Sequence, residues 1–307
     1  MKTCPFRGVS FFFLLTMAIG MMVPALCRAA PESGPFKVEE SQVVFKEING
    51  VKLAMSVYSP VMKERKDLPA IIFFHGGGWN VGSRRSFDLQ AKYLASVGIV
   101  VFSADYRLAT RDKVTVAECV KDAKSAIRYI RENAKDFGIS PDKIVASGAS
   151  AGAHLAACTA VVEGYDESGD DLDVSAVPDA MILFCAPVRI ERERLNAAYQ
   201  QRFDGQEEAL SPYNHVRAGL PPTLLLSGDK DTQVPIEFVR GFAEKMQASG
   251  NECVVVEFAG KGHDFSRYDR QPDSFTQSLA EVEKRMDELY GQNQPSWLEA
   301  YVATLKQ

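Results

Sequence analysis

Apolar and polar positions alternate along residues 43–58, and the alternation continues on both sides of Asn49 and Gly50. A period of two is typical of a half-buried β-strand, and an Asn-Gly pair accepts the positive φ values of a tight hairpin turn. We therefore predict an antiparallel hairpin at residues 43–58, which forms an antiparallel edge at the start of the sheet.

Further along the chain, the apolar positions gather into six short runs. Such runs fit strands that are buried on both faces of a sheet. Between them lie helical patterns, of which the clearest covers residues 115–137 with Gly138 placed to end it. Strands that alternate with helices predict a mostly parallel α/β sheet with helices on both faces. The six runs are residues 70–74, 99–104, 143–147, 180–184, 223–227 and 253–258.

Two segments that connect predicted strands are long enough to predict a structure for each. Residues 163–177 are acidic, and we expect them to form a surface loop. Residues 189–216 resemble a helical insertion between two strands, and we expect them to form a small lid.

The first 29 residues have the layout of a secretory signal. Lys2 and Arg7 precede an uncharged apolar run at residues 8–27, and small residues follow it. We expect cleavage after Ala29, which leaves residues 30–307 as a single domain. The protein is then exported, to the periplasm or the extracellular space.

The same uncharged run is long enough to be an uncleaved membrane anchor. Pro24 and the small residues beyond it favour cleavage instead, so we expect no stable membrane insertion. A lipid anchor at Cys27 is disfavoured, because Leu26 stands where lipoprotein signals prefer a small residue.

The net charge and the positions of the cysteines limit which partners and cofactors we expect the protein to bind. Removal of residues 1–29 takes away three basic residues and no acid, which moves the formal net charge from −5 to −8. That balance does not suit a nucleic-acid-binding protein. The remaining cysteines lie singly in apolar stretches without metal-ligand spacing, so we expect buried free thiols and no metal. They are Cys119, Cys158, Cys185 and Cys253.

Ser150 stands among small residues in the stretch GASAG, residues 148–152. A predicted buried strand precedes it and a predicted helix follows it, so the turn between them is very tight. Such a turn leaves no room for side chains at Gly148 and Gly152, and it exposes the serine hydroxyl above the carboxyl end of the sheet. The pattern is that of a nucleophilic serine.

A serine hydroxyl is a weak nucleophile at neutral pH, so it needs a base, and the base needs an orienting acid. His263 follows the predicted strand at residues 253–258 and is the candidate base. Asp231 and Asp229 both follow the preceding strand and compete as the acid. Attack on a carbonyl also requires backbone N–H donors for the oxyanion, and the glycine-rich stretch at residues 73–82 supplies them.

Five motifs together resemble the α/β-hydrolase esterases of the hormone-sensitive-lipase and feruloyl or acetylxylan esterase type. The resemblance covers about residues 40–290 and implies Ser150, Asp231 and His263 as the catalytic triad. It also implies backbone oxyanion donors at Gly77, Gly78 and Ala151, and no cofactor. The motifs are HGGGW at 75–79, DYRLA at 105–109, GASAGAHLA at 148–156, DKDTQVP at 229–235 and GHDF at 262–265.

Two departures favour the carbohydrate-ester branch of this family over the lipase branch. DYRLA continues into TRDKVTVAE rather than into a proline-rich stretch, and a hairpin rather than a helical cap precedes the first parallel strand. The resemblance therefore implies a small-molecule or polysaccharide ester as the substrate.

Other polar residues of these motifs have structural interpretations. His154 lies one helical turn after Ser150, so we expect it to be structural rather than the base. We expect His75, together with Asp105 and Arg107, to fix the glycine loop by hydrogen bonds. His215 either lines the pocket or caps an element.

The resulting hypothesis is an exported serine carboxylesterase that hydrolyses short-chain acyl or feruloyl esters, on carbohydrate, through an acyl-enzyme. Two alternatives stay open. One is a serine peptidase of the prolyl-oligopeptidase type, and the other is a catalytically silent hydrolase-fold protein that binds a ligand in the same cleft.

Overall fold

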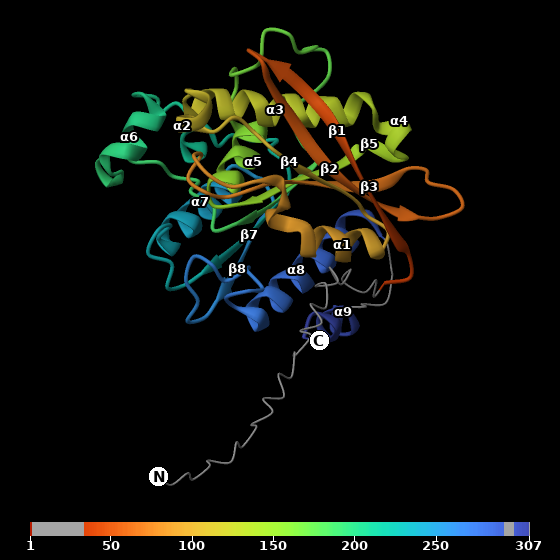
Figure 1. Ribbon diagram of the computed structural model, residues 1–307. Helices are drawn as coiled ribbons and strands as arrows, with labels where there is room; N and C mark the ends of the chain where they lie inside the picture. Colours follow the sequence, from red (N-terminus) through yellow and green to blue (C-terminus); the bar gives the residue numbers. More distant parts are fainter. Residues whose placement is uncertain (2–33, 292–297, 307) are drawn as a thin grey trace. The chain divides into compact units, whose positions relative to one another are not determined.

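The computed structural model describes residues 34–291 and 298–306, together with Met1 (Figure 1). Apart from Met1, the predicted signal segment at residues 1–29 lies outside these residues. Within them, no helix combines the length and the apolar character needed to cross a membrane.

Eight strands form one sheet in the order β1-β2-β4-β3-β5-β6-β7-β8. The pairs β1·β2 and β2·β4 are antiparallel, and every other neighbouring pair is parallel. The predicted α/β-hydrolase fold, with a mostly parallel sheet and an antiparallel N-terminal edge, is confirmed. The strands are β1 (Lys37–Ile48), β2 (Val51–Val61), β3 (Leu68–Phe74), β4 (Val100–Ala104), β5 (Ile139–Ala149), β6 (Ala180–Phe184), β7 (Thr223–Gly228) and β8 (Cys253–Phe258).

The N-terminal hairpin turns where the sequence predicts it. Ile48 pairs with Val51, and the two residues between them have positive φ values, 50° for Asn49 and 76° for Gly50. Asn and Gly tolerate this left-handed conformation better than other residues, so the dipeptide fixes the register of the edge.

Side chains of the central strands alternate between two hydrophobic cores, one on each face of the sheet. Ile72 and Phe74 of β3 join the core under α3, α5 and α7, whereas Ile71 and Phe73 join the core under α1, α8 and α9. Figure 1 shows α3 on one side of the sheet and α1 with α8 on the other. The helices are η1 (Arg84–Phe87), α1 (Asp88–Ser96), α2 (Ala109–Asp112), α3 (Val116–Glu132), α4 (Ala134–Phe137), α5 (Ala151–Val161), η2 (Arg192–Arg194), α6 (Ala197–Phe203), η3 (Pro212–His215), α7 (Ile236–Ala248), α8 (Pro272–Tyr290) and α9 (Leu298–Leu305).

Two details differ from the sequence prediction. The helix predicted at 115–137 is interrupted at Asn133, whose backbone leaves the helical region and whose side-chain amide donates to Tyr129 O at 2.8 Å. The strand β8 is not buried on both faces, because it is an edge strand and leaves Val254 44% exposed.

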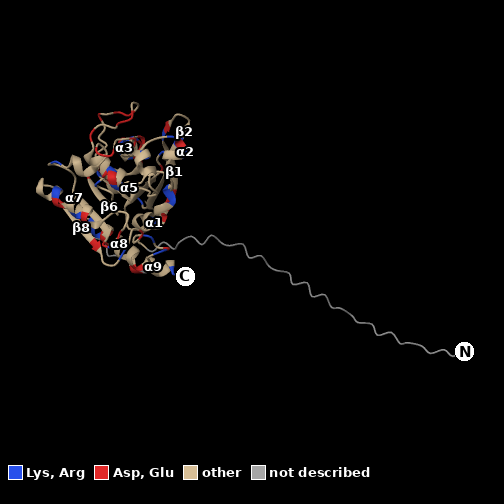
Figure 2. Cartoon of the chain, turned by 90° about the vertical axis from the view of Figure 1, so that its left-hand side faces the viewer, with Lys and Arg blue, Asp and Glu red and all other residues tan. Residues whose placement is uncertain are grey.

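The acidic segment 163–177 is a loop, as predicted, and basic side chains of α3 hold it against that helix. Arg128 forms ion pairs with Asp166 at 2.6 Å and with Asp170 at 3.1 Å. Figure 2 shows acidic residues gathered on the loop beside α3. The charge of this segment is therefore largely neutralised by contacts within the protein.

Candidate active site

Ser150 forms the turn between β5 and α5. Its φ of 54° and ψ of −123° are an uncommon conformation for a residue with a side chain, and such strain often marks a functional position. A Cβ atom on Gly152 would lie 1.9 Å from Phe74 O, and one on Gly148 would lie 2.6 Å from the same oxygen. The end of β3 therefore passes so close to the turn that only glycine fits at both positions.

The turn also presents backbone N–H groups beside the serine. Ala151 is the first residue of α5, and the N–H groups of the first turn of a helix lack acceptors within the helix. Ser150 N itself donates to Phe184 O at 2.9 Å, which ties the turn to the end of β6.

His263 and Asp231 meet at the carboxyl ends of β8 and β7. The ring atom Nδ1 of His263 lies 2.7 Å from Asp231 Oδ2. The other carboxylate oxygen of Asp231 accepts from the backbone N–H groups of Gln233 at 2.8 Å and Val234 at 3.0 Å. Asp229, the competing acid, instead accepts from Gly260 N.

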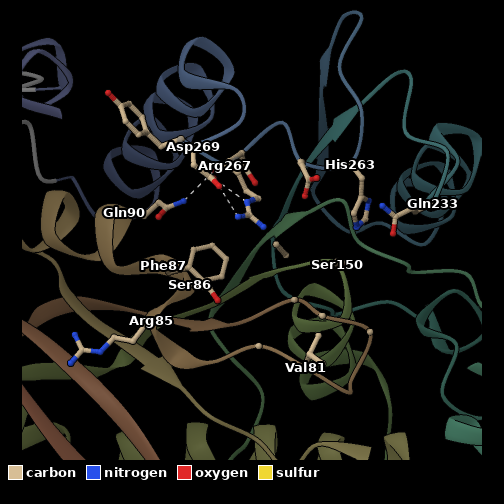
Figure 3. Close-up of a pocket in the computed structure, with 18 of the residues that line it drawn as sticks. Val81, Arg85, Ser86, Phe87, Gln90, Ser150, Gln233, His263, Arg267 and Asp269 are labelled. Atoms are coloured by element: carbon tan, nitrogen blue, oxygen red, sulfur yellow. Dashed lines mark hydrogen bonds and ion pairs between the residues drawn. The ribbon is translucent and has the colours of Figure 1, made fainter. Parts of the chain in front are cut away.

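The charge of Asp231 is stabilised although its side chain is fully buried. Burial alone raises the pKa of Asp231, but the hydrogen bonds from His263, Val234 and Gln233 outweigh it, and that pKa is lowered from its ordinary value. A neutral imidazole that donates from Nδ1 keeps its acceptor lone pair on Nε2. His263 and Ser150 border the same cavity (Figure 3).

The glycine loop after β3 passes beside Ser150. A Cβ atom on Gly76 would lie 3.5 Å from Ser150 Cβ, and Gly77 and Gly78 follow with φ values of 116° and 59°. Gly77 O accepts from the backbone N–H groups of Asn80 and Val81, three and four residues later, both at 3.1 Å. The loop is thus held in one conformation with its glycines lining the cavity.

The residues that support this loop are only partly those expected. His75 donates from Nδ1 to Gly76 O at 2.8 Å, and Tyr106, which the sequence analysis missed, donates to His75 O at 2.8 Å. The prediction for Arg107 is wrong, because its guanidinium pairs with buried Asp122 at 2.8 Å. Asp105 does not bind the glycines of the loop; it binds Arg84, which follows the loop in the sequence.

Cys185, Asp231 and His263 each place one potential metal-ligand atom within 4.8 Å of the others. Their hydrogen bonds already use these atoms, since the thiol donates to His263 O at 3.0 Å and the imidazole binds the carboxylate. Burial raises the pKa of the Cys185 thiol well above its ordinary value, and the Asp231 carboxylate adds to the shift. A protonated thiol is a poor metal ligand, so the group fits a hydrogen-bonded network better than a metal centre.

Two further histidines stand outside the cavity. His154 is fully buried and its Nε2 donates to Leu210 O at 2.7 Å, which agrees with a structural role. His215 donates to Ala209 O at 2.8 Å within the 189–216 segment, so it fixes that segment rather than lining the pocket. All four described cysteines are buried and free, as expected.

The cavity has a volume of about 830 Å³ and extends to both sides of Ser150 (Figure 3). The 189–216 segment contributes Tyr199 and Arg202 of α6 to its wall, consistent with the small lid that the sequence predicts. Neither residue belongs to a recognisable motif, and the sequence analysis missed both. Other lining residues that it missed are Arg85, Phe87, Gln90, Gln233, Arg267, Tyr268 and Phe275.

Comparisons with known proteins agree with this arrangement. Residues 55–183 match the BD-FAE family. The chain is 30% identical to the esterase LipC of Mycobacterium tuberculosis over 66% of this chain and 55% of that protein. It is 29% identical to a probable isoprenylcysteine alpha-carbonyl methylesterase of Arabidopsis thaliana over 64% of this chain and 45% of that protein. The chain thus spans about half the length of these curated relatives.

One solved structure matches a larger share of the chain than these curated relatives do. The apo form of Thermogutta terrifontis esterase 2 is 39% identical, with a TM-score of 0.78 over 88% of this chain and 100% of that one. Further structures of that esterase are described as propionate-bound, butyrate-bound and phosphorylated by paraoxon. The chain therefore belongs to the serine esterases of the α/β-hydrolase fold.

Proposed function

We propose that the protein is an exported carboxylesterase that hydrolyses short-chain acyl esters, with Ser150, His263 and Asp231 as its catalytic triad. One observation carries the proposal: the 2.7 Å hydrogen bond between His263 and Asp231 orients an imidazole in the same cavity as a serine on a strained turn. A base with a buried carboxylate partner, in the same cavity as a partly exposed serine, is the arrangement that activates a hydroxyl.

In the proposed reaction, Ser150 Oγ attacks the ester carbonyl while His263 Nε2 accepts its proton. The resulting imidazolium is stabilised by Asp231, whose lowered pKa keeps it ionised. His263 then protonates the leaving alcohol as the tetrahedral intermediate collapses to an acyl-enzyme. Water, activated by the same imidazole, releases the acid and restores the serine.

The backbone N–H groups of Gly77, Gly78 and Ala151 are the proposed oxyanion donors. Gly77 and Gly78 lie in the loop that borders Ser150, and Ala151 opens α5. A fixed donor of this kind contributes about 2.7 to 4 kcal/mol to the stability of the transition state.

The acyl group that we propose is short, acetyl to butyryl, or an aromatic feruloyl group. Propionate and butyrate are bound in the structures of the related Thermogutta terrifontis esterase. We propose a carbohydrate as the alcohol, because polar side chains such as Gln90 and Gln233 border the cavity and would donate to sugar hydroxyls. Export would bring the enzyme to polysaccharide esters outside the cell.

The test is steady-state hydrolysis by the wild-type protein and by Ser150→Ala. The substrates are p-nitrophenyl acetate, butyrate and octanoate, beside acetylated xylan and methyl ferulate. We expect the wild type to prefer the short esters, and Ser150→Ala to lose roughly 10⁴-fold or more of kcat with its folding intact. Near wild-type activity in that variant would refute the triad.

Two further measurements separate the remaining parts of the proposal. A fluorophosphonate probe should label the wild type and not Ser150→Ala, because labelling requires an activated serine; absence of labelling would favour a silent binding protein. N-terminal sequencing of the protein from an exported fraction should begin at Ala30, and retention of residues 1–29 in the cytoplasm would contradict export.

A further inference from the structure

The charges that line the active-site cavity are almost all neutralised by ion pairs. Arg267 pairs with Asp269 at 2.8 Å, as Figure 3 shows, and Arg85 pairs with Asp88 at 3.3 Å. Asp264 pairs with Arg270 at 2.6 Å. Each of the three carboxylates that line the cavity thus has a guanidinium partner.

Arg202 is the exception among the charged residues of the described cavity wall. It forms no ion pair with any carboxylate of the described residues, and its Nη1 donates to the carbonyl oxygen of Gly78 at 2.8 Å. A guanidinium carries five N–H donors, so this single hydrogen bond leaves most of its donors available. The cavity wall therefore holds one uncompensated positive charge.

The guanidinium of Arg202 is also held in place. Its central carbon lies 4.8 Å from the ring centroid of Tyr199, one turn earlier in α6. A Cβ atom on Gly78 would lie 3.1 Å from Arg202 Nη1, so the group rests against the loop that we propose to bind the oxyanion. A planar cation fixed between an aromatic ring and a glycine loop is preorganised for an anion, at low cost in side-chain entropy.

We propose that Arg202 binds a carboxylate of the substrate, so that the preferred esters are those whose alcohol or acyl part carries an acid group, such as a uronate. This inference rests on the proposed esterase function and names the class of substrate. The rigid fork of N–H groups matches a carboxylate, and the charge-assisted hydrogen bonds are stronger than those to a neutral group. Because Arg202 is partly exposed, salt should weaken the preference.

The experiment compares matched pairs of esters that differ in one negative charge. For the alcohol side, the pair is 4-acetoxybenzoate and its methyl ester. For the acyl side, the pair is mono-4-nitrophenyl adipate and its methyl ester. The readout is the ratio of kcat/KM for the anionic ester to that for the neutral ester, measured at 0.05 M and 0.5 M NaCl.

We expect Arg202→Gln to lower this ratio by about tenfold to a hundredfold in at least one pair, which also identifies the side that carries the acid. Arg202→Lys, which keeps the charge and loses the fork, should lower it less. The matched control is Arg240→Gln, which removes an equal charge at an exposed ion pair between α7 and Glu257 of β8 and should leave the ratio unchanged.

Three results would separate the possible failures. An unchanged ratio in Arg202→Gln would overturn the inference while the esterase proposal stands. Equal losses on the anionic and neutral esters would also overturn it, because Arg202 would then act by positioning Gly78. Hydrolysis of no ester by the wild type would refute the proposed function itself.

Discussion

The turn at Ser150 and the segment 189–216, which we predict to act as a lid and call the lid segment, both border the cavity, yet they are held by different kinds of contact. At the turn, backbone lies against backbone, with Phe74 O where the Cβ atom of Gly152 would be. In the lid, side chains make the contacts, such as Arg202 with Gly78 O and Arg192 with Glu207. The first arrangement allows almost no substitution, whereas the second allows many.

This difference separates two tasks of an enzyme. The chemical step needs groups fixed to fractions of an ångström, and closely packed backbone supplies that precision. The choice of substrate needs a wall that can vary without disturbing the chemistry, and short helices on a connecting segment provide it. The four predictions below test this division.

The largest effect is expected where strand ends fix the reacting groups. Asp231→Asn should lower kcat by roughly 10³- to 10⁴-fold with little change in stability, because the amide cannot stabilise the imidazolium or hold the same tautomer of His263. Asp229→Asn, two residues away, should change kcat less than threefold, since the Asp229 carboxylate contacts Gly260 N and Lys230 rather than His263. Equal losses in the two variants would contradict the assignment of the acid.

The next effect tests the close packing at the turn. Gly152→Ala should lower the free energy of unfolding by about 3 kcal/mol or more, because the new Cβ atom would lie 1.9 Å from Phe74 O. The control is Gly241→Ala in α7, where a Cβ atom meets nothing within 4 Å; it should raise that free energy by about 0.5 to 1 kcal/mol. Urea unfolding measures both, and a harmless Gly152→Ala would show that the turn can relax.

The same division explains how much the sequence could predict. Close backbone packing requires glycine at fixed positions, so GASAG and HGGGW are visible as local patterns, and the strands before them are visible as apolar runs. The expectations for Ser150 and His263 followed from such local patterns together with the order of the strands, whereas the choice of Asp231 over Asp229 came from the resemblance to the esterase family.

The contacts that the sequence did not reveal join distant residues without a pattern of their own. Arg107 lies in the DYRLA motif, yet it pairs with Asp122 of α3, because a buried carboxylate needs a charged partner. No pattern in the sequence indicates that Asp122 is buried or that Arg107 is its partner. Arg202 and Tyr199 reach the cavity only because α6 folds back over Gly78. Such contacts depend on the tertiary fold, so a single sequence cannot indicate them.

His154 connects the two regions, and its burial makes that connection sensitive to pH. It lies in the helix after the turn and donates to Leu210 O in the lid segment. Burial lowers the pKa of His154 to about 4 from an ordinary value of 6.5. Between about pH 6.5 and pH 4, the unfolded chain therefore binds a proton on His154 that the folded protein does not bind. The free energy of unfolding consequently falls as the pH falls through this interval.

This group alone should reduce the free energy of unfolding by about 2 to 3 kcal/mol between pH 7 and pH 4.5. His154→Gln cannot titrate, so its loss over the same interval should be smaller by that amount. Urea unfolding at pH 7, 5.5 and 4.5 gives the comparison. If the free energy of unfolding depends on pH equally in the two proteins, the pKa of His154 is the same in the folded and unfolded states, which would contradict the prediction.

The smallest effect compares the loss of a helix N-cap in the lid segment with the same loss in the core. Asn196 caps α6 by accepting from Tyr199 N at 3.1 Å, and Thr115 caps α3 in a capping box with Glu118. Each Ala substitution should cost about 1 kcal/mol locally. In Thr115→Ala the cost should appear in the free energy of global unfolding, because α3 belongs to the main core.

In Asn196→Ala the cost should instead fall on a local opening of the lid, so KM should rise about two- to fivefold with the global free energy nearly unchanged. Neither cap contacts the turn at Ser150, so kcat should stay close to that of the wild type in both variants. If Asn196→Ala destabilises the whole protein as much as Thr115→Ala and leaves KM alone, the lid unfolds with the core. The turn and the lid segment would then differ in their contacts, but the lid segment would not open independently of the core.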